Sequence, residues 1–564
     1  MQLQESYQKA AFEGSECPQT GPGSPKYRDF GDMRNWDVYG EMKKVGGEHE
    51  LAIDSITLSG RPIVWEPHFT FHGFRYVQLE QFPAVHDGSD SIDTDNFTAI
   101  VIHTDMERTG WFECSEPLLN RLHENAVWSM RGNFVGVPTD CPQRDERLGW
   151  TGDLQAFAPA ASFLYSPHGM LKTWLRGLAA EQHENGRGVP PLVSPDIFRG
   201  KMINPIAIWG DSTVTIPWDL YQSSGDVQVL SDQYTSMLEW LDRGVIRDGR
   251  RLWDANKSYQ LADWLDPEAP PTEPGNGRTD NDLVANAFLI HSTDTMCKIS
   301  SVLGLDEDQL RYHSESQALR REFSKEYVTA SGRVVSDSQT ALALALHFSL
   351  LASPEQETHA AERLAHIILS KSRFKIATGF AGTPILGHAL TKVGKSQLFY
   401  RMLLHKKCPS FLYPVTMGAT TTWERWDSML PDGSINPGEM TSFNHYALGS
   451  VVHWMHMIIG GLQPLKPGWK MFLISPIPGG TITHAKVRHD SPYGMIEVSW
   501  EVQGDTLHLR ASVPPNTHAT IRLPGQAACE VGCGVYEMTV PYIAPEWPPL
   551  PKYPPFTPHD DDEP

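Results

Sequence analysis

The amino-acid sequence predicts a multidomain protein in which a toroid of paired helices lies between two antiparallel β-sandwich domains. Three observations support this fold class. Helical periodicity continues through the middle of the chain, with about a dozen candidate helices over roughly 350 of the 564 residues. Strand patterns stand before and after this region. The helices do not alternate with strands, which disfavours a TIM barrel.

The sequence divides into five segments. Residues 1–35 lack periodicity and are predicted to be a poorly ordered lead-in. Residues 36–110 are predicted to form an N-terminal β-sandwich, residues 111–463 the helical domain, and residues 464–544 a C-terminal β-sandwich. The last segment, residues 545–564, is a Pro-rich and then acidic tail.

The strand predictions rest on short runs of β-branched and aromatic residues near period two. The predicted strands are 50–58, 69–79 and 97–103 in the N-terminal domain and 471–474, 495–501 and 506–513 in the C-terminal domain. Residues 97–103 and 471–474 are short apolar runs, whereas 495–501 and 506–513 alternate between apolar and polar residues.

The helix predictions rest on apolar residues at helical spacing, as in Leu118, Leu122, Val127 and Met130. The predicted helices are 117–130, one from Asp153, one capped by Ser166-Pro167, and 211–223, 227–245, 280–303, 307–326, 338–350, 355–371, 384–392, 395–405 and 441–459. Short turns alternate with long Gly/Pro-rich loops between them. Paired helices with the long loops at one end predict an inner ring that carries a pocket at that end.

Composition excludes several classes of function. The net charge of −21 argues against a nucleic-acid-binding protein and against docking on anionic lipid. No apolar run reaches the roughly 18 residues of a membrane span. The 17 Trp and 17 Tyr are compatible with a sugar site, because the apolar face of a pyranose stacks on an indole.

Cysteine usage predicts neither a disulfide framework nor a zinc site, because the seven cysteines are scattered and no CxxC pair occurs. We therefore expect no metal and no cofactor. Residues 1–25 are polar throughout, so no signal peptide is expected there. Compartment and oligomeric state stay open.

The stretch DCPQRDERLGWTGD (140–153) is the strongest candidate site. It holds four carboxylates, two arginines and one tryptophan between helical patterns. Glycosidic bond hydrolysis needs one carboxylic acid and one carboxylate, and this stretch can supply them. The alternative is a solvated loop in which Arg144 and Arg147 pair with Asp145 and Glu146. The residues of this stretch alone leave both interpretations open.

Two further clusters of residues and two Trp/Asp pairs each allow a functional and a structural interpretation. In TTTWERWD (420–427), Glu424 stands between two indoles, as in a stacking and proton-transfer site or at a helix start with buried tryptophans. In SFNHY (442–446), a lone histidine such as His445 is more often structural than functional. The pairs Trp209/Asp211 and Asp263/Trp264 are each either a Trp platform with a hydroxyl-binding Asp, or core packing with a helix cap.

These motifs together resemble glycoside hydrolase family 78, the bacterial and fungal α-L-rhamnosidases. The similarity covers TDCPQRDERLGWTGD (139–153), WEPHFTFHGFRYV (65–77), ATTTWERW (419–426), SFNHY (442–446) and the PGW junction at 467–469. All five motifs occur in the family's order and spacing, over about residues 60–525.

The resemblance implies an (α/α)6 barrel flanked by β-sandwiches, and an inverting hydrolase that releases terminal α-L-rhamnose from a rhamnose-containing glycoside or polysaccharide. By position in the motifs, Glu146 would be the general acid and Glu424 the general base. The implied substrate-binding residues are Asp140, Arg144, Asp145, Trp150, Asp153, Trp209, Trp264, Trp426 and His445. The alternatives are another inverting (α/α)6 glycosidase and a non-catalytic sugar-binding relative. The family usually carries further β domains upstream, whereas little more than one precedes the helices here.

Overall fold

A computed structural model describes residues 96–552 apart from 144–145, 271 and 439, together with residues 2–4, 54, 56–57, 63–74 and 76–78. The lead-in, the strand predicted at 50–58 and the acidic end of the tail lie mostly outside these residues. Within the strand predicted at 69–79, β2 (Tyr76–Gln78) pairs antiparallel with β1 (Gln2–Gln4).

The apolar run 97–103 does not form the predicted strand. Its residues have no strand structure, and Ile100, Val101 and Ile102 are all exposed. A strand requires a neighbour for its backbone hydrogen bonds, and no described strand lies against this run. The apolar pattern was therefore misleading here.

The helical domain follows the predicted order of helices. Its elements, with η for short 3₁₀ or π turns, are α2 (Pro117–Asn133), α3 (Thr151–Leu164), α4 (His168–Asn185), α5 (Ser212–Ser224), α6 (Val227–Glu239), η5 (Trp240–Gly244), α7 (Asn281–Leu303), α8 (Asp306–Tyr327), α9 (Gln339–His347), α10 (Pro354–His366), η6 (Ile367–Lys371), α11 (Thr383–Lys392), α12 (Ser396–Leu403), α13 (Leu412–Thr416), η7 (Ala447–Ser450), α14 (Val451–Trp454) and η8 (Met455–Ile459). Two details differ from prediction. The short α13 was missed, and the helix predicted at 441–459 begins at Ala447, because residues 441–446 form a hydrogen-bonded loop.

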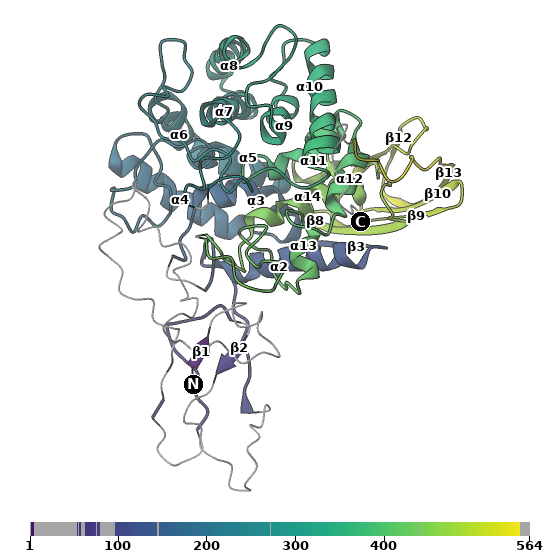
Figure 1. Ribbon diagram of the computed structural model, residues 1–564, viewed down its shortest axis with the longest axis horizontal. Coiled ribbons are helices and arrows are strands. Elements are labelled where there is room, and N and C mark those ends of the chain that lie inside the picture. Colours follow the sequence, from purple (N-terminus) through teal and green to yellow (C-terminus); the bar gives the residue numbers. More distant parts are fainter. Residues whose placement is uncertain are drawn as a thin grey trace.

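Six helical segments close a ring. Helix α3 packs against α5, α5 against α7, α7 against α9, and α9 against α11. Helix α11 contacts η7 and α14, and both of these return to α3. Ring helices such as α3 and α9 are buried along almost their whole length, whereas outer helices such as α8 and α10 keep an exposed face. Figure 1 shows the helical domain with the C-terminal strands at one side.

The C-terminal strands form two sheets. The strands are β3 (Gly110–Cys114), β6 (Leu462–Pro464), β7 (Met471–Ile474), β8 (His484–Ser491), β9 (Gly494–Gln503), β10 (Thr506–Val513), β11 (His518–Ile521), β12 (Cys529–Val531) and β13 (Gly534–Pro541). One sheet has the order β13-β10-β9-β8-β3 and the other β12-β11-β7-β6. The three strands predicted for this domain are confirmed.

The strand order corrects two expectations. Strand β3, which precedes the helices in sequence, pairs antiparallel with β8 and so belongs to the C-terminal sheet. Strands β7 and β11 pair in parallel, so the domain is not wholly antiparallel. Between β7 and β11 the chain forms three strands of the other sheet, and such a crossover returns it in the same direction.

A group of buried histidines lies between the helices and strand β8. The Nε2 atoms of His123 on α2 and His456 on η8 are 2.8 Å apart. The ring of Phe163 on α3 stacks on His456 at 3.7 Å and on His489 of β8 at 4.7 Å. All three histidines are buried. They therefore connect the helical ring to the five-stranded sheet through aromatic packing.

This contact is expected to weaken in acid. Burial lowers the pKa of His123 and of His456, and it lowers the pKa of His489 to about 3. At His123 burial outweighs the opposing effect of the Glu124 carboxylate. In the unfolded chain each pKa is about 6.5, so the unfolded state takes up protons first. The stabilisation is full above that value, and the free energy of unfolding should fall as pH drops from about 6.5.

Chemical denaturation at pH 7.5 and pH 5 measures this effect. His489→Phe should reduce the loss between the two pH values, while replacing the exposed His313 by Asn should leave it unchanged. An equal acid sensitivity of wild type and His489→Phe would contradict the assignment.

No described helix combines the length and the apolar composition that crossing a membrane requires.

Candidate active site

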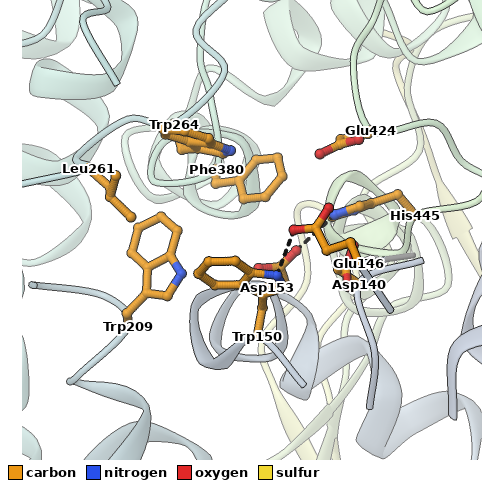
Figure 2. A pocket seen from close by; sticks show the side chains of 10 residues that line it. All are labelled: Asp140, Glu146, Trp150, Asp153, Trp209, Leu261, Trp264, Phe380, Glu424 and His445. Atoms are coloured by element: carbon orange, nitrogen blue, oxygen red, sulfur yellow. Dashed lines mark hydrogen bonds and ion pairs between the residues drawn. The ribbon is translucent and has the colours of Figure 1, made fainter. Parts of the chain in front are cut away.

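A pocket opens where loops enter the ring of helices. Its volume is about 330 Å³ with the open mouth included, and it is lined by Asp140, Glu146, Trp150, Asp153, Trp209, Leu261, Trp264, Phe380, Glu424 and His445. These residues lie on loops or first turns before α3, α5, α7, α11 and η7, at the N-terminal ends of ring segments. The partial positive charge of helix N-termini favours carboxylates at this end. Figure 2 shows the carboxylates and indoles around one space.

The sequence-predicted residues come together here with three exceptions. Arg144 and Asp145 lie outside the described residues. Trp426 lines a second cavity of about 320 Å³, together with Phe411 and Trp423. Its ring meets that of Phe411 edge to face at 5.0 Å. The expected contact of Trp426 with a sugar therefore stays a prediction.

The loop before α3 fixes Asp140 and Glu146. The Oδ1 atom of Asp140 accepts a hydrogen bond from the backbone N–H of Leu148, at 2.8 Å. Trp150, the residue before the first turn of α3, donates its indole N–H to Oε1 of Glu146 at 2.8 Å. Glu146 thus lines the wall of a pocket, whereas Arg144 and Asp145, on which the solvated-loop interpretation also depends, lie outside the described residues.

Asp140, Cys141 and Glu146 are the group that comes nearest to a metal site among the described residues. Their ligand atoms lie within 4.8 Å of one another. Two of the three side chains line the pocket, and Glu146 already accepts the N–H of Trp150. A polar ligand of the pocket accounts for these carboxylates equally well, so the grouping does not by itself indicate an ion.

His445 is linked to Asp153, and both residues line the pocket. Its Nε2 lies 2.8 Å from Oδ1 of Asp153, and the backbone N–H of Ala447 donates to its Nδ1 at 3.4 Å. The Nε2 atom therefore carries the hydrogen of this bond. Burial lowers the pKa of His445, but the hydrogen bond and charge of Asp153, with the charges of Glu424 and Asp140, outweigh it and raise the pKa. The sequence could not distinguish this histidine from a structural one.

Glu424 is held in the same pocket by backbone pairing with Ser442. Its N–H donates to the carbonyl of Ser442 at 2.9 Å, and the N–H of Ser442 donates to its Oε2 at 3.0 Å. The amide of Gln143 donates to Oγ of Ser442 at 2.8 Å, which ties the loop of Glu146 to that of Glu424. Glu424 is 3% exposed. Two carboxylates far apart in sequence thus reach one pocket in fixed positions.

The remaining wall is apolar and includes two residues that the sequence did not reveal. Leu261 and Phe380 join Trp209 and Trp264 there. The N–H of Phe380 donates to the carbonyl of Trp264 at 2.8 Å, which places the two rings on adjoining loops. Phe380 carried no sequence signal, because an isolated apolar residue resembles core. Leu261 could have been found only by its closeness to the Asp263/Trp264 pair.

The aspartates beside the tryptophans hold the backbone and do not line the pocket. Asp263 accepts hydrogen bonds from the N–H groups of Ala381 and Gly382, at 3.1 and 3.0 Å. Burial, with the charge of Asp266, raises the pKa of Asp263 to about 6. Asp211 likewise accepts from the N–H of Ile208 at 2.7 Å. Each pair therefore combines both interpretations, with a tryptophan at the pocket and a structural aspartate.

The position of Trp209 depends on a glycine in α3. A Cβ atom at Gly152 would lie 2.4–2.7 Å from the indole of Trp209. Gly152→Ala should therefore lower the free energy of unfolding by about 1–3 kcal/mol, the usual cost of overpacking. Urea unfolding measures it. The control is Gly169→Ala in α4, where a Cβ meets nothing within 4 Å. Equal stability of the two variants would contradict this close packing.

Comparisons with known proteins agree along the chain. Residues 107–459 match the family model described as the bacterial alpha-L-rhamnosidase 6 hairpin glycosidase domain. Residues 461–533 match the C-terminal domain of the same family, and residues 37–103 match its concanavalin-like domain. The matches follow the order predicted from the motifs.

Individual proteins similar to this chain are also described as α-L-rhamnosidases. An α-L-rhamnosidase of Streptomyces avermitilis is 39% identical over 500 residues, covering 86% of this chain and 46% of the relative. The crystal structure of native α-L-rhamnosidase from Aspergillus terreus superposes with a TM-score of 0.83 at 50% identity, covering 86% of this chain and 56% of that one. The Streptomyces avermitilis structure complexed with L-rhamnose gives a TM-score of 0.78 at 38% identity, covering 86% of this chain and 47% of that one.

The chain spans about half the length of the curated relatives it matches. On these matches and its motifs, the chain belongs to the bacterial α-L-rhamnosidase family.

Proposed function

We propose that this protein hydrolyses terminal α-L-rhamnosidic bonds with inversion at the anomeric carbon, with Glu146 as general acid and Glu424 as general base. The observation that carries the proposal is the convergence of these two glutamates on one pocket. Each comes from its own loop, and each is oriented by a hydrogen bond from the protein. We interpret the ring of helices that frames them as an (α/α)6 barrel.

The two glutamates differ in ways that suit two roles. Glu146 receives the indole N–H of Trp150 on one oxygen, and a carboxylate oxygen of Asp140 lies within 4.8 Å of it. A carboxyl in such surroundings can deliver a proton to the leaving glycosidic oxygen. Glu424 reaches the same pocket from a different loop (Figure 2), where a carboxylate can deprotonate a water that attacks C1 of the sugar.

The other lining residues suit a 6-deoxy sugar. Asp140, Asp153 and His445 offer charged or polar atoms for hydroxyl groups. We assign Leu261 and Phe380 to the methyl group of rhamnose, because a CH₃ prefers an apolar surface where a hydroxymethyl would lose its hydrogen bonds. Arg144, Asp145 and Trp426 remain proposed substrate contacts.

Release of nitrophenol from a panel of nitrophenyl glycosides tests this function. The panel contains α-L-rhamnoside, α-D-mannoside, β-D-glucoside and α-D-glucoside. We expect α-L-rhamnoside to be hydrolysed with the highest kcat/KM. Hydrolysis of a glucoside without any action on the rhamnoside would identify another glycosidase. Binding of L-rhamnose without turnover of any rhamnoside would identify a non-catalytic relative.

A further inference from the structure

The loop that carries Glu146 is held by a segment from outside the helical domain. The guanidinium of Arg147 donates from Nη1 to the carbonyl of Phe71 at 3.1 Å, and its Cζ lies 5.6 Å from the centre of the Phe71 ring. A cation close to an aromatic ring adds attraction to this hydrogen bond. Arg147 directly follows Glu146, so the upstream segment reaches the immediate neighbour of a pocket residue.

The same segment packs closely against the beginning of the loop. A Cβ atom at Gly73 would lie 2.8 Å from Cγ of Pro142 and 3.1 Å from Cβ of Gln143. Both of these loop residues are buried. Only a residue without a side chain fits at this close approach. Residues 71–73, which we call the strap, therefore contact the loop both before and after Glu146.

The backbone of Arg147 has an unfavourable conformation. Its φ of +39° lies in the left-handed region, which a residue with a side chain rarely adopts. Such a conformation persists only where the surroundings impose it, and it is most frequent at functional sites. Here Phe71 holds the side chain of Arg147, while the next residue, Leu148, exchanges hydrogen bonds of 2.8 and 3.0 Å with Asp140. These contacts fix the turn that follows Glu146.

We infer that Arg147 is a positioning residue for the general acid and that the strap holds it in this role. The inference rests on the proposed function, which assigns proton donation to Glu146. The turn at Arg147 sets the place of the Glu146 carboxyl group, one oxygen of which accepts the indole N–H of Trp150. A displacement of about 1 Å can cost about 10²-fold in rate. Proton donation in the helical domain thus depends on a segment upstream of it.

Arg147→Ala tests the positioning role on substrates with different leaving groups. On nitrophenyl α-L-rhamnoside we expect kcat/KM to fall about ten- to hundredfold, because the acid is displaced but present. The loss should shrink on the dinitrophenyl rhamnoside, whose leaving group needs little protonation. In a Glu146→Gln background, Arg147→Ala should cause little further loss, because the group that it positions is already absent.

Arg243→Ala is the matched control for Arg147→Ala. Arg243 on η5 also donates to a distant backbone carbonyl, that of Gly186, at 2.8 Å. It is not among the residues that line the pocket. Its replacement should therefore leave kcat/KM at the wild-type value on both rhamnosides.

Gly73→Ala tests the strap without changing any residue of the loop. The added Cβ must push residues 71–73 away from Pro142, so we expect a smaller loss than in Arg147→Ala with the same dependence on the leaving group. The control is Gly249→Ala in another loop, where a Cβ meets nothing within 4 Å. If Arg147→Ala does not fold, as judged from its Tm, Gly73→Ala decides.

Three results would overturn the inference. Equal losses on the two leaving groups would show that Arg147 stabilises the protein without positioning the acid. Losses that multiply in the double variant with Glu146→Gln would show that the two residues act independently. Wild-type kinetics for Gly73→Ala would reject the strap.

The behaviour of wild type separates this inference from the proposed function. If wild type hydrolyses rhamnosides but Arg147→Ala lacks the leaving-group dependence, only the inference fails. If wild type hydrolyses another glycoside and no rhamnoside, the proposed function fails, and the same comparison of leaving groups on that glycoside decides the inference. If wild type hydrolyses no glycoside, both are rejected.

Discussion

Glu146→Gln is expected to lower kcat on nitrophenyl α-L-rhamnoside by about 10²–10⁴-fold, the usual contribution of a positioned general acid. Gln keeps the size of the side chain and can still accept the N–H of Trp150, but it cannot donate a proton to the leaving oxygen. The loss should shrink for a rhamnoside with a dinitrophenyl leaving group, which needs little protonation. Initial rates on both substrates measure this.

The control for this variant is Glu184→Gln, an exposed glutamate on α4, which should retain full activity. Thermal unfolding should show that both variants are folded. Activity of Glu146→Gln within tenfold of wild type would reject the acid assignment. A loss of the same size on both leaving groups would show that Glu146 acts in some other way.

Glu424→Gln should cause a loss of similar size, about 10²–10⁴-fold in kcat, for a different reason. The amide still accepts from the N–H of Ser442 but cannot take a proton from the attacking water. Water must attack with every substrate, so the loss should not shrink with the dinitrophenyl leaving group. Parallel assays of both Gln variants therefore distinguish the base from the acid.

A small anionic nucleophile sharpens the test of Glu424. In Glu424→Ala, azide fits the vacated space and needs no deprotonation, so added azide should restore turnover and give a rhamnosyl azide. Glu146→Ala should gain nothing from azide on the nitrophenyl substrate if its limiting step is departure of the leaving group. If azide restored turnover in Glu146→Ala but not in Glu424→Ala, Glu146 would be the base and Glu424 the acid.

Much of the fold was predictable because local patterns determine it. Helical periodicity located nearly all ring and outer helices, since each must bury an apolar stripe. Which strand pairs with which in the sheets was not determined by local sequence. Nothing in the sequence of β3 indicates that it joins β8 almost at the other end of the chain, or that β7 and β11 run parallel. The exposed run 97–103 has the composition of a strand without a described partner.

The candidate site was predictable where its chemistry is unusual. Charge density marked Asp140, Glu146 and Asp153, and indoles beside a carboxylate marked Glu424. Their meeting in one pocket depends on the ring of helices, which local sequence does not specify. Phe380 could not be distinguished from core, because an isolated apolar residue carries no sign of the pocket that it lines. These features require coordinates.

The stereochemistry of the released sugar tests the central claim most directly. Proton NMR during the first minutes of hydrolysis of an α-L-rhamnoside separates the anomers before mutarotation mixes them. A pair of carboxylates acting as acid and base on a single water predicts that β-L-rhamnose appears first. First appearance of α-L-rhamnose would show retention through a covalent intermediate and would contradict the assignment of Glu424 as the base that activates water.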